Sequence, residues 1–329
     1  PASTASIRHE GSSKFAADNR WANFWSATAG WRISNEEFMK DFDWLDDLKI
    51  RFGYGVTGNN DFSATYMANM LGSDTNWMMP NGTWAYSYGK SQNVNPNLGW
   101  EEKKEWNLGV DYSFFEGRLY GKFDYYRREV DNLLFSVKVP QPPYTQGSQM
   151  QNIGSMESKG WEFEVGGDII RTKDFTWSSS MNLSHNTGKI LTLEGDNSYH
   201  NGNGFVAPGT PGDAARMEAG STIGSFYMWK FAGFDDEGSF LLYNKDGEVI
   251  PAAQKTENDK QYIGNYTPKL IIGWSHTLTY KNFDLGINLR SWIDFDVYNT
   301  INMYYGIQGQ GNLNVLKDAY GKFNHIKGE

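Results

Sequence analysis

Two carboxylates, Glu162 and Glu164, have the spacing in this chain that most resembles a catalytic pair. On a β-strand, residues two apart share one face and lie about 7 Å from each other. Glycosidases place two carboxyl groups at roughly this separation, one as the acid and one as the base or nucleophile. However, alternate acids are the ordinary result of a strand with one wet face, and nothing in the surrounding sequence builds a cleft. We therefore expect no catalytic residues.

Metal and cofactor motifs are weak or absent in the sequence. Asp235, Asp236 and Glu237 could bind calcium through carboxylate oxygens, although an acidic turn explains them equally simply. The five histidines are widely scattered without an HExxH pair, there is no cysteine, and no phosphate-binding G-x-x-x-x-G-K-[ST] string is present. A net charge of -9 without a basic cluster argues against nucleic acid. We expect no metal, no cofactor and no enzymatic activity.

One aromatic-rich segment could bind a ligand. It lies between residues 61 and 89, and its rings are Tyr66, Trp77, Trp84, Tyr86 and Tyr88. Flat rings stack on the apolar faces of sugars and dominate protein interfaces. The alternative is that these rings only pack the segment against its neighbours or belong to an aromatic girdle. We expect substrate contact or contact with a partner protein here.

The elements that must position these residues are long strands with one apolar and one polar face. One run has apolar residues at every second position: Trp106, Leu108, Val110, Tyr112 and Phe114. The same alternation extends from Phe283 to Val297, which is long for soluble sheets with strands of about five or six residues. A tilted strand that crosses a bilayer needs about 9–11 residues. The pattern predicts an all-β protein, an antiparallel transmembrane β-barrel.

The connections between the predicted strands alternate between short and long. We place strands near residues 2–9, 20–32, 47–57, 100–115, 118–130, 159–170, 174–187, 268–281 and 282–299. The residues from 34 to 47 have a helical repeat, which predicts one or two amphipathic turns. Outer-membrane barrels have short periplasmic turns and long extracellular loops, so the asymmetry gives the direction of each strand. No stretch approaches the ~20 apolar residues of a membrane-spanning helix.

Charged residues in the polar phase of these strands are expected to face the barrel lumen, because charges on the lipid side are costly. They are Arg51, Asp111, Lys122, Asp124, Arg128, Glu162, Glu164, Asp284 and Arg290. They could guide a polar solute. The interpretation that we favour is that they form ion pairs and hydrogen bonds with one another and with the plug that fills the lumen.

Several long strings resemble the C-terminal barrel half of SusC/RagA-family TonB-linked outer-membrane proteins. They are RFGYGVTGNN at 51–60, the segment NPNLGWEEKKEWNLGVDYSFFEGRLYGKFDYYRREVDNLL at 95–134, NIGSMESKGWEFEV at 152–165, IGSFYMWKFAGFDDEG at 223–238 and YIGNYTPKLIIGWSHTLTYKNFDLGINLR at 262–290. The resemblance implies a barrel of about 22 strands with an N-terminal plug. We expect residues 1–329 to be a partial receptor barrel of about nine strands, with the plug domain and both ends of the barrel outside it.

The resemblance also implies a function. Such a barrel imports oligosaccharides (glycans) or peptides across a Bacteroidota-type outer membrane, with a SusD-like surface lipoprotein as its lid. TonB, ExbB and ExbD would supply energy through the missing N-terminal region, and outer-membrane lipid would surround the wall. Two alternatives stay open: a structural barrel that docks surface lipoproteins or another outer-membrane assembly, and a passive porin.

Overall fold

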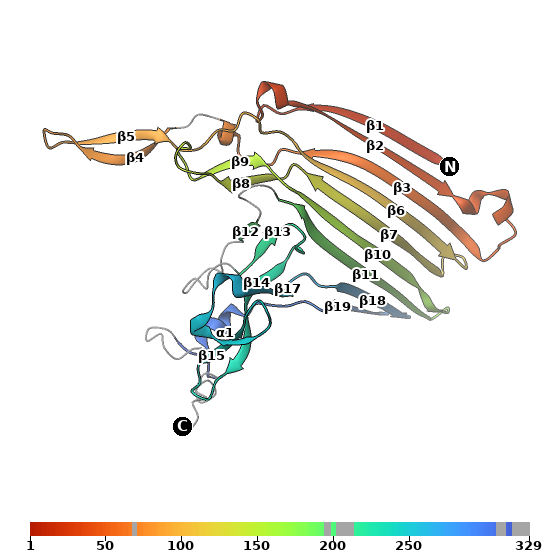
Figure 1. Ribbon diagram of the computed structural model, residues 1–329. Coiled ribbons are helices and arrows are strands. Elements are labelled where there is room, and N and C mark those ends of the chain that lie inside the picture. Colours follow the sequence, from red (N-terminus) through yellow and green to blue (C-terminus); the bar gives the residue numbers. More distant parts are fainter. Residues whose placement is uncertain (68–70, 194–198, 202–213, 307–313, 318–329) are drawn as a thin grey trace. The chain divides into compact units, whose positions relative to one another are not determined.

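The computed structural model describes residues 1–67, 71–193, 199–201, 214–306 and 314–317. The chain divides into two compact units, of which the first comprises residues 1–198 and 270–292 and the second comprises residues 199–269 and 293–329. Strands dominate both units (Figure 1). No helix in the described part of the chain is long and apolar enough to cross a membrane.

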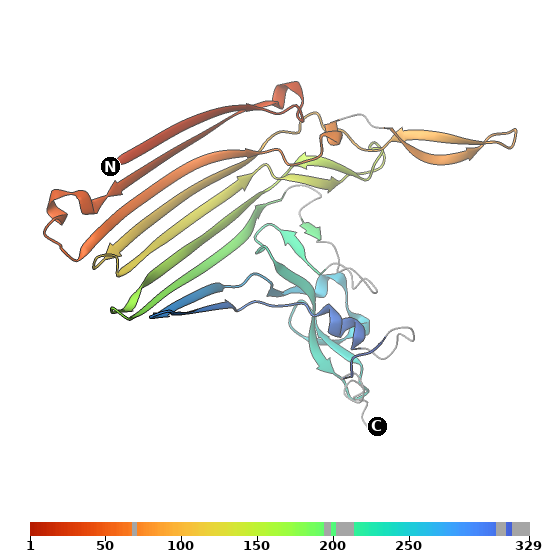
Figure 2. The same cartoon turned by 180° about the vertical axis from the view of Figure 1, so that it is seen from behind.

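The first unit is built on one antiparallel sheet of nine strands, which we call the wall. Its strands are hydrogen-bonded in the order β1-β2-β3-β6-β7-β10-β11-β18-β19. They are β1 Ala2–Gly11, β2 Trp21–Arg32, β3 Leu45–Asn59, β6 Glu101–Phe114, β7 Leu119–Asp131, β10 Ser155–Arg171, β11 Phe175–Thr192, β18 Leu270–Tyr280 and β19 Phe283–Ile293. Figure 2 shows the same strands from behind, side by side in a single layer. The predicted all-β class and the nine antiparallel strands are confirmed.

The last wall strand is shorter than predicted. The alternation of the sequence continues to Val297, but β19 ends at Ile293 because Asp294 adopts a left-handed backbone conformation (φ 56°). Asp296 then turns back to Asn265, and its carboxylate accepts the backbone N–H of Asn265 at 2.8 Å. A period-two pattern therefore marks extended residues without marking where sheet pairing stops.

The predicted helical turns between β2 and β3 are present as two short 3₁₀ helices, η2 Ile33–Asn35 and η3 Glu37–Met39.

The short turns lie where the sequence placed them. In the turn between β6 and β7, Phe115, Glu116 and Gly117 all have positive φ angles, and Asp46 accepts the backbone N–H groups of Glu116 and Gly117. Such a compact turn joins two neighbouring strands without a loop.

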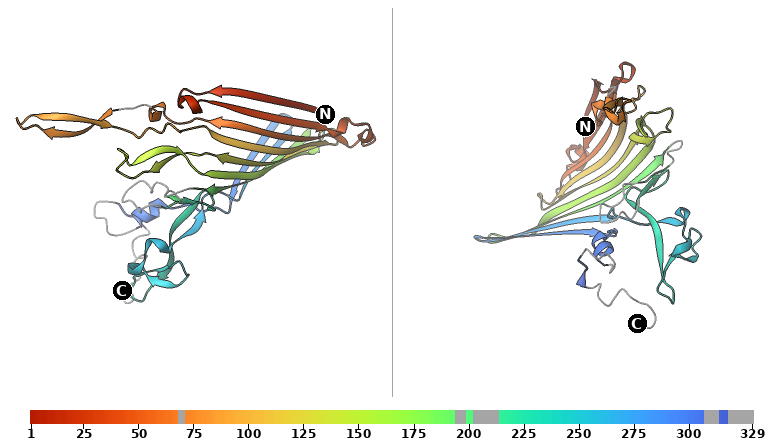
Figure 3. Two further views of the ribbon diagram at one scale, coloured as in Figure 1. Left: turned by 45° about the horizontal axis from the view of Figure 1, so that its top comes forward. Right: turned by 90° about the vertical axis from the view of Figure 1, so that its left-hand side faces the viewer.

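The long connections contain sheets that the sequence analysis did not predict. In the first unit, two hairpins form separate two-stranded sheets, one from β4 Leu71–Met78 and β5 Trp84–Lys90 and the other from β8 Leu134–Lys138 and β9 Ser148–Asn152. Figure 3 shows these elements in two further views. These strands are short and their pairing is local, so the strong alternation of the wall strands is not needed to form them.

The second unit contains a four-stranded sheet in the order β16-β15-β14-β17, together with the pair β12-β13. Its elements are β12 Tyr199–Asn201, β13 Arg216–Glu218, β14 Ser225–Phe234, β15 Phe240–Tyr243, β16 Val249–Pro251, η6 Ala252–Gln254, η7 Glu257–Asp259, β17 Lys260–Asn265 and α1 Thr300–Tyr305. The predicted tail from residue 306 lies mostly outside the described residues.

Candidate functional site

The wall brings charged residues of neighbouring strands into two adjacent rows on one sheet face, which together we call the charged ladder. In the register of the sheet, Asp111 lies opposite Lys122, and Lys122 lies opposite Glu164. Residues that lie directly opposite share a sheet face. Six of the residues predicted to face the lumen belong to these rows: Arg51, Asp124 and Glu162 to one, and Asp111, Lys122 and Glu164 to the other.

Arg51 is the centre of the ladder. Its guanidinium donates to both carboxylate oxygens of Asp111 at 2.8 Å, and its Nη2 donates to Asp124 at 3.2 Å. The side chains of all three are partly buried. A bidentate contact of this kind fixes both partners more firmly than a single ion pair does. The sequence predicted the shared face of these residues but not their pairing, because pairing depends on the register between strands.

Two of the remaining polar-phase residues, Arg128 and Asp284, have hydrogen-bond partners of their own. Arg128 Nε donates to Glu105 at 2.9 Å, and Asp284 accepts from the hydroxyl of Thr279 at 2.8 Å. Arg290 and Glu164 line the same cavity of about 250 Å³. Their orientation toward a lumen stays a prediction.

The paired carboxylates Glu162 and Glu164 lie in different surroundings. Glu164 forms an ion pair with Lys122 (Nζ to Oε2, 3.1 Å), whereas Glu162 lies opposite Asp124 and Ser184. Both lie on an open sheet face, where water reaches them, and no described group is placed to bind a sugar between them. Their arrangement is that of a ladder rather than that of a hydrolytic centre.

The acidic turn from Asp235 to Glu237 joins β14 and β15. One carboxylate oxygen of Asp235 accepts the backbone N–H groups of Glu237 and Ser239 at 3.0 and 2.8 Å. Across the described ranges, no three His, Asp or Glu side chains gather as metal ligands would. At least one of the three acids, Asp235, therefore stabilises the turn itself.

The aromatic segment divides into two parts. Tyr66 lies in the 3₁₀ helix η4 Ala64–Met67 and packs against a buried cluster, whereas the other four rings lie on the β4–β5 hairpin. On β5, Trp84, Tyr86 and Tyr88 occupy alternate positions and are 65%, 69% and 69% exposed. Trp77 lies opposite Ala85, so its ring is on the other face of the hairpin. Three exposed rings about 7 Å apart thus form one aromatic face.

A hydrogen-bonded base, which we call the platform, lies beside this hairpin in the chain. Its apolar centre is Phe15, Phe62 and Leu98, with Trp100 packed against Phe15 at 5.1 Å between ring centroids. The amide of Asn93 donates to the carbonyls of Gln146 and Ser148 and accepts from Thr145. The platform therefore ties together three connections that are far apart in the sequence.

In the second unit, two ionisable groups are held by specific partners. Burial, followed by the hydrogen bond to Glu218, raises the pKa of Tyr262 to about 12. Asp259 closes a capping box with Thr256, whose hydroxyl and backbone N–H both donate to it and lower its pKa. Both groups are held by hydrogen bonds that stabilise local structure.

Comparison with known proteins decides the family. The sequence profile described as "TonB dependent receptor-like, beta-barrel" matches residues 3–299. The chain belongs to this family of receptor barrels. It is 34% identical over 307 residues to the TonB-dependent receptor SusC of Bacteroides thetaiotaomicron, and 32% identical over 321 residues to the TonB-dependent receptor P3 of Formosa agariphila. Each alignment covers 90% of this chain and 30% of the relative, so the chain spans about a third of these relatives' length.

Solved structures agree with the sequence comparison. The RagAB peptide transporter matches with a TM-score of 0.74 and 27% identity, over 87% of this chain and 31% of that one. The RagAB peptide importer in its closed-closed state matches with a TM-score of 0.75. The predicted resemblance to SusC and RagA proteins is confirmed, and the receptor barrel belongs to the outer membrane.

The apolar face of the receptor barrel carries two aromatic belts. One belt includes the pairs Trp25 with Tyr54, Trp106 with Tyr125, and Trp161 with His185. The other includes the pairs Trp44 with Phe114 and Trp177 with His276. On β11, eight residues separate His185 from Trp177, which is about 27 Å of strand. A strand tilt of roughly 40° reduces this to roughly 20 Å, close to the ~25 Å apolar band of outer-membrane barrels.

Proposed function

We propose that the receptor barrel is the wall of an active importer of the outer membrane, which takes up oligosaccharides or peptides with energy delivered through TonB. The observation that carries this proposal is the nine-stranded wall, which matches the RagAB peptide transporter along 87% of the chain. The chain itself performs no catalysis. Its charged ladder lines the path of a polar solute or contacts the plug.

The partners of the importer follow from the same likeness. A SusD-like surface lipoprotein closes the extracellular mouth as a lid, and TonB with ExbB and ExbD acts through a region outside this chain. The exposed aromatic face of the β4–β5 hairpin is suited to either a glycan or the lid, because rings give large contact areas at low entropic cost.

Substitution of the aromatic face tests this role. We expect Trp84→Ala combined with Tyr86→Ala to lower uptake of the substrate, or recovery of the lid lipoprotein on co-purification, by about tenfold. Trp77→Ala is the matched control, because its ring is equally exposed on the other face of the same hairpin. Equal losses of uptake or of lid recovery in both variants would show that the aromatic face does not bind the substrate or the lid.

The second candidate function is docking, in which the receptor barrel anchors surface lipoproteins without transporting a solute. The exposed hairpin favours it as much as it favours import. Gentle extraction of the full-length protein, with mass spectrometry of the co-purifying material, separates the two. Recovery of one lid lipoprotein with bound glycan or peptide supports import and identifies the substrate class, whereas several stable partners without bound solute support docking.

A further inference from the structure

A cluster of cations lies on the apolar face of the wall, directly beyond the belt that contains Trp161. Arg127 of β7 lies opposite Lys159 of β10, which is two residues from Trp161 and therefore shares its face. Lys189 of β11 lies opposite Glu157, so it belongs to this face too. Arg127, Lys159 and Lys189 are all exposed. We call these three residues the outer cations.

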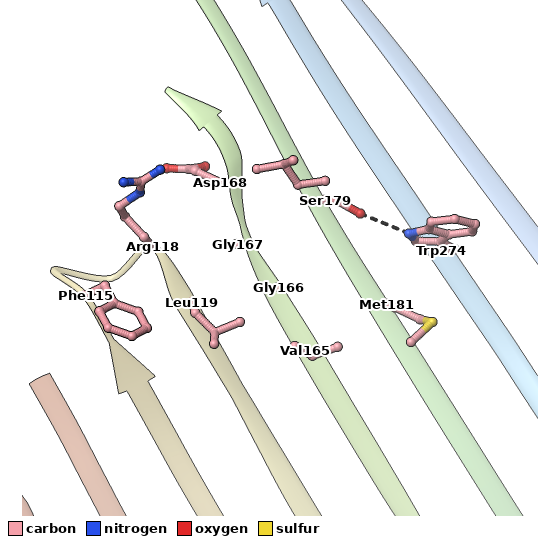
Figure 4. Close-up of a pocket in the computed structure, with 11 residues that line it drawn as sticks. Phe115, Arg118, Leu119, Val165, Gly166, Gly167, Asp168, Ser179, Met181 and Trp274 are labelled. Carbon is pink, nitrogen blue, oxygen red and sulfur yellow. Dashed lines mark hydrogen bonds between the residues drawn. The ribbon is translucent and has the colours of Figure 1, made fainter. Parts of the chain in front are cut away.

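The outward positions of β7 and β10 between their short turns and this belt carry no charge. They are Leu119, Gly121, Phe123 and Tyr125 on β7, and Gly167, Val165, Phe163 and Trp161 on β10. Part of this surface lines a hollow of about 600 Å³ (Figure 4). Arg118 and Asp168, drawn in the same view, belong to the polar face, because each is one residue from an outward position. The first charges on the outer face of these two strands are therefore Arg127 and Lys159.

The outer cations lie at the extracellular end of this apolar surface. The long connection between β7 and β10 leaves the wall after Asp131 and returns at Ser155, and outer-membrane barrels carry their long loops outside the cell. Aromatic belts mark the level of the lipid headgroups. Lys159 is two residues beyond Trp161, which is about 7 Å along the strand. The outer cations are therefore at the level of the headgroups of the outer leaflet.

A buried carboxylate fixes two of these cations. Glu157 is 8% exposed, and it forms ion pairs with Nε of Arg127 at 2.7 Å and with Nζ of Lys159 at 3.3 Å. The two cationic side chains remain 46% and 49% exposed. One negative charge is thus shared by two cations, and Lys189 lies opposite it as a third. The group has an excess of positive charge on an exposed surface.

The other acids of this part of the face lie farther along the strands than Arg127 and Lys159. They are Glu102, Glu129 and Asp131. Lys104 lies opposite Glu129 and forms an ion pair with Asp131 at 2.7 Å, so part of their charge is balanced. All the charge in the row nearest the belt is therefore positive, whereas the rows beyond it are mixed.

We infer that the outer cations bind the phosphate of a glycolipid of the outer leaflet, with its acyl chains against the uncharged outward positions of β7 and β10. Charge complementarity supports this occupant, because three cations meet the headgroup level and apolar rows continue from there into the membrane. Arginine offers two parallel donors to phosphate oxygens, and lysine adds a point charge. The outer leaflet of an outer membrane consists mainly of phosphorylated glycolipids, so this ligand surrounds the wall at that depth. The inference depends on the membrane placement and not on import, so its failure leaves the proposed function intact.

The test titrates the purified full-length receptor in detergent with diphosphorylated lipid A, and native mass spectrometry counts the bound lipid. Lipid A without its phosphates is the comparison ligand. We expect Lys159→Gln combined with Lys189→Gln to weaken lipid A binding by about tenfold. This variant leaves the buried ion pair of Arg127 in place, so the fold should be kept. The matched control is Lys173→Gln combined with Lys281→Gln, which removes two exposed cations from short turns at the other end of the wall.

A charge-conserving variant completes the test. Lys159→Arg combined with Lys189→Arg keeps both charges and should keep the binding of lipid A. Three outcomes would overturn the inference: equal lipid A binding by the glutamine variant and the parent protein, an equal loss in the control variant, and equal binding of lipid A with and without its phosphates. Phosphatidylglycerol bound as tightly as lipid A would show that any anionic lipid suffices and would contradict the assignment to a glycolipid.

Discussion

The wall and the platform hold their side chains in opposite ways. In the wall, large apolar residues such as Phe52, Leu108 and Trp274 stay exposed on one face. In the platform, Phe15 and Leu98 are fully buried and the polar groups satisfy one another. The wall is therefore specified by the two solvents on its faces, lipid and water, whereas the platform is specified by its protein neighbours.

This difference explains what the sequence could predict. The period-two alternation shows which residues meet lipid, and it located all nine wall strands. It could not show that Arg51 pairs with Asp111 and Asp124, because one residue of slip between strands would change every partner. The platform has no repeat at all: the contacts of Asn93 and Asn152 join segments about 50–60 residues apart along the chain.

The aromatic hairpin had a signal that the sequence analysis missed. Trp84, Tyr86 and Tyr88 alternate with small or polar residues, the same pattern that identified the wall. The alternation covers only five residues, which is too short to separate from a ring-rich loop. The separation of Tyr66 from the other rings depended on tertiary packing.

The largest effect should come from a charge on the apolar face of the wall. Met181 lies midway between the two belts on β11, and Met181→Arg should destabilise the folded receptor by about 2–4 kcal/mol. Ser180→Arg, one residue away on the polar face, is the matched control and should cost about 1 kcal/mol or less. Unfolding by guanidinium in lipid vesicles measures both. Similar losses for the pair would mean that the two faces do not meet different solvents.

A cavity in the platform should act locally. Leu98→Ala removes a fully buried side chain and should lower the free energy of platform opening by about 2–4 kcal/mol. Hydrogen exchange of the Gly99 amide, which donates to Asn152, reports this opening. Leu71→Ala, at an exposed position, should change it little. Equal acceleration of wall amides would contradict the independence of the two regions.

Removal of the ladder's central cation should have a moderate effect. Arg51→Ala leaves Asp111 and Asp124 close together without their shared partner, and we expect a loss of about 1–2 kcal/mol in unfolding free energy. Asp111→Asn in the same chain should restore part of that stability. An additive double-mutant cycle would show that the contacts are too solvated to couple.

The smallest effect should be a local response to pH in the second unit. The pKa of Asp259 lies below the ordinary value of 3.8 because Thr256 donates to its charged form. The stabilisation is therefore present above about pH 4 and is lost as the pH falls through the lowered pKa. Hydrogen exchange of the Thr256 amide, followed as a function of pH, measures this stabilisation. Thr256→Val should move the loss of stabilisation to higher pH. An unchanged pH profile would show that the Thr256 hydroxyl does not lower the pKa of Asp259.

Uptake by living cells tests the proposed import most directly. Cells that contain or lack the full-length protein would be offered labelled oligosaccharide and peptide pools, before and after collapse of the proton gradient. We predict that one pool enters only with the protein present and only while the gradient holds. Uptake that is the same with and without the protein, and the same before and after collapse of the gradient, would contradict import. If lipoproteins still bound the receptor in that case, docking would remain as the function.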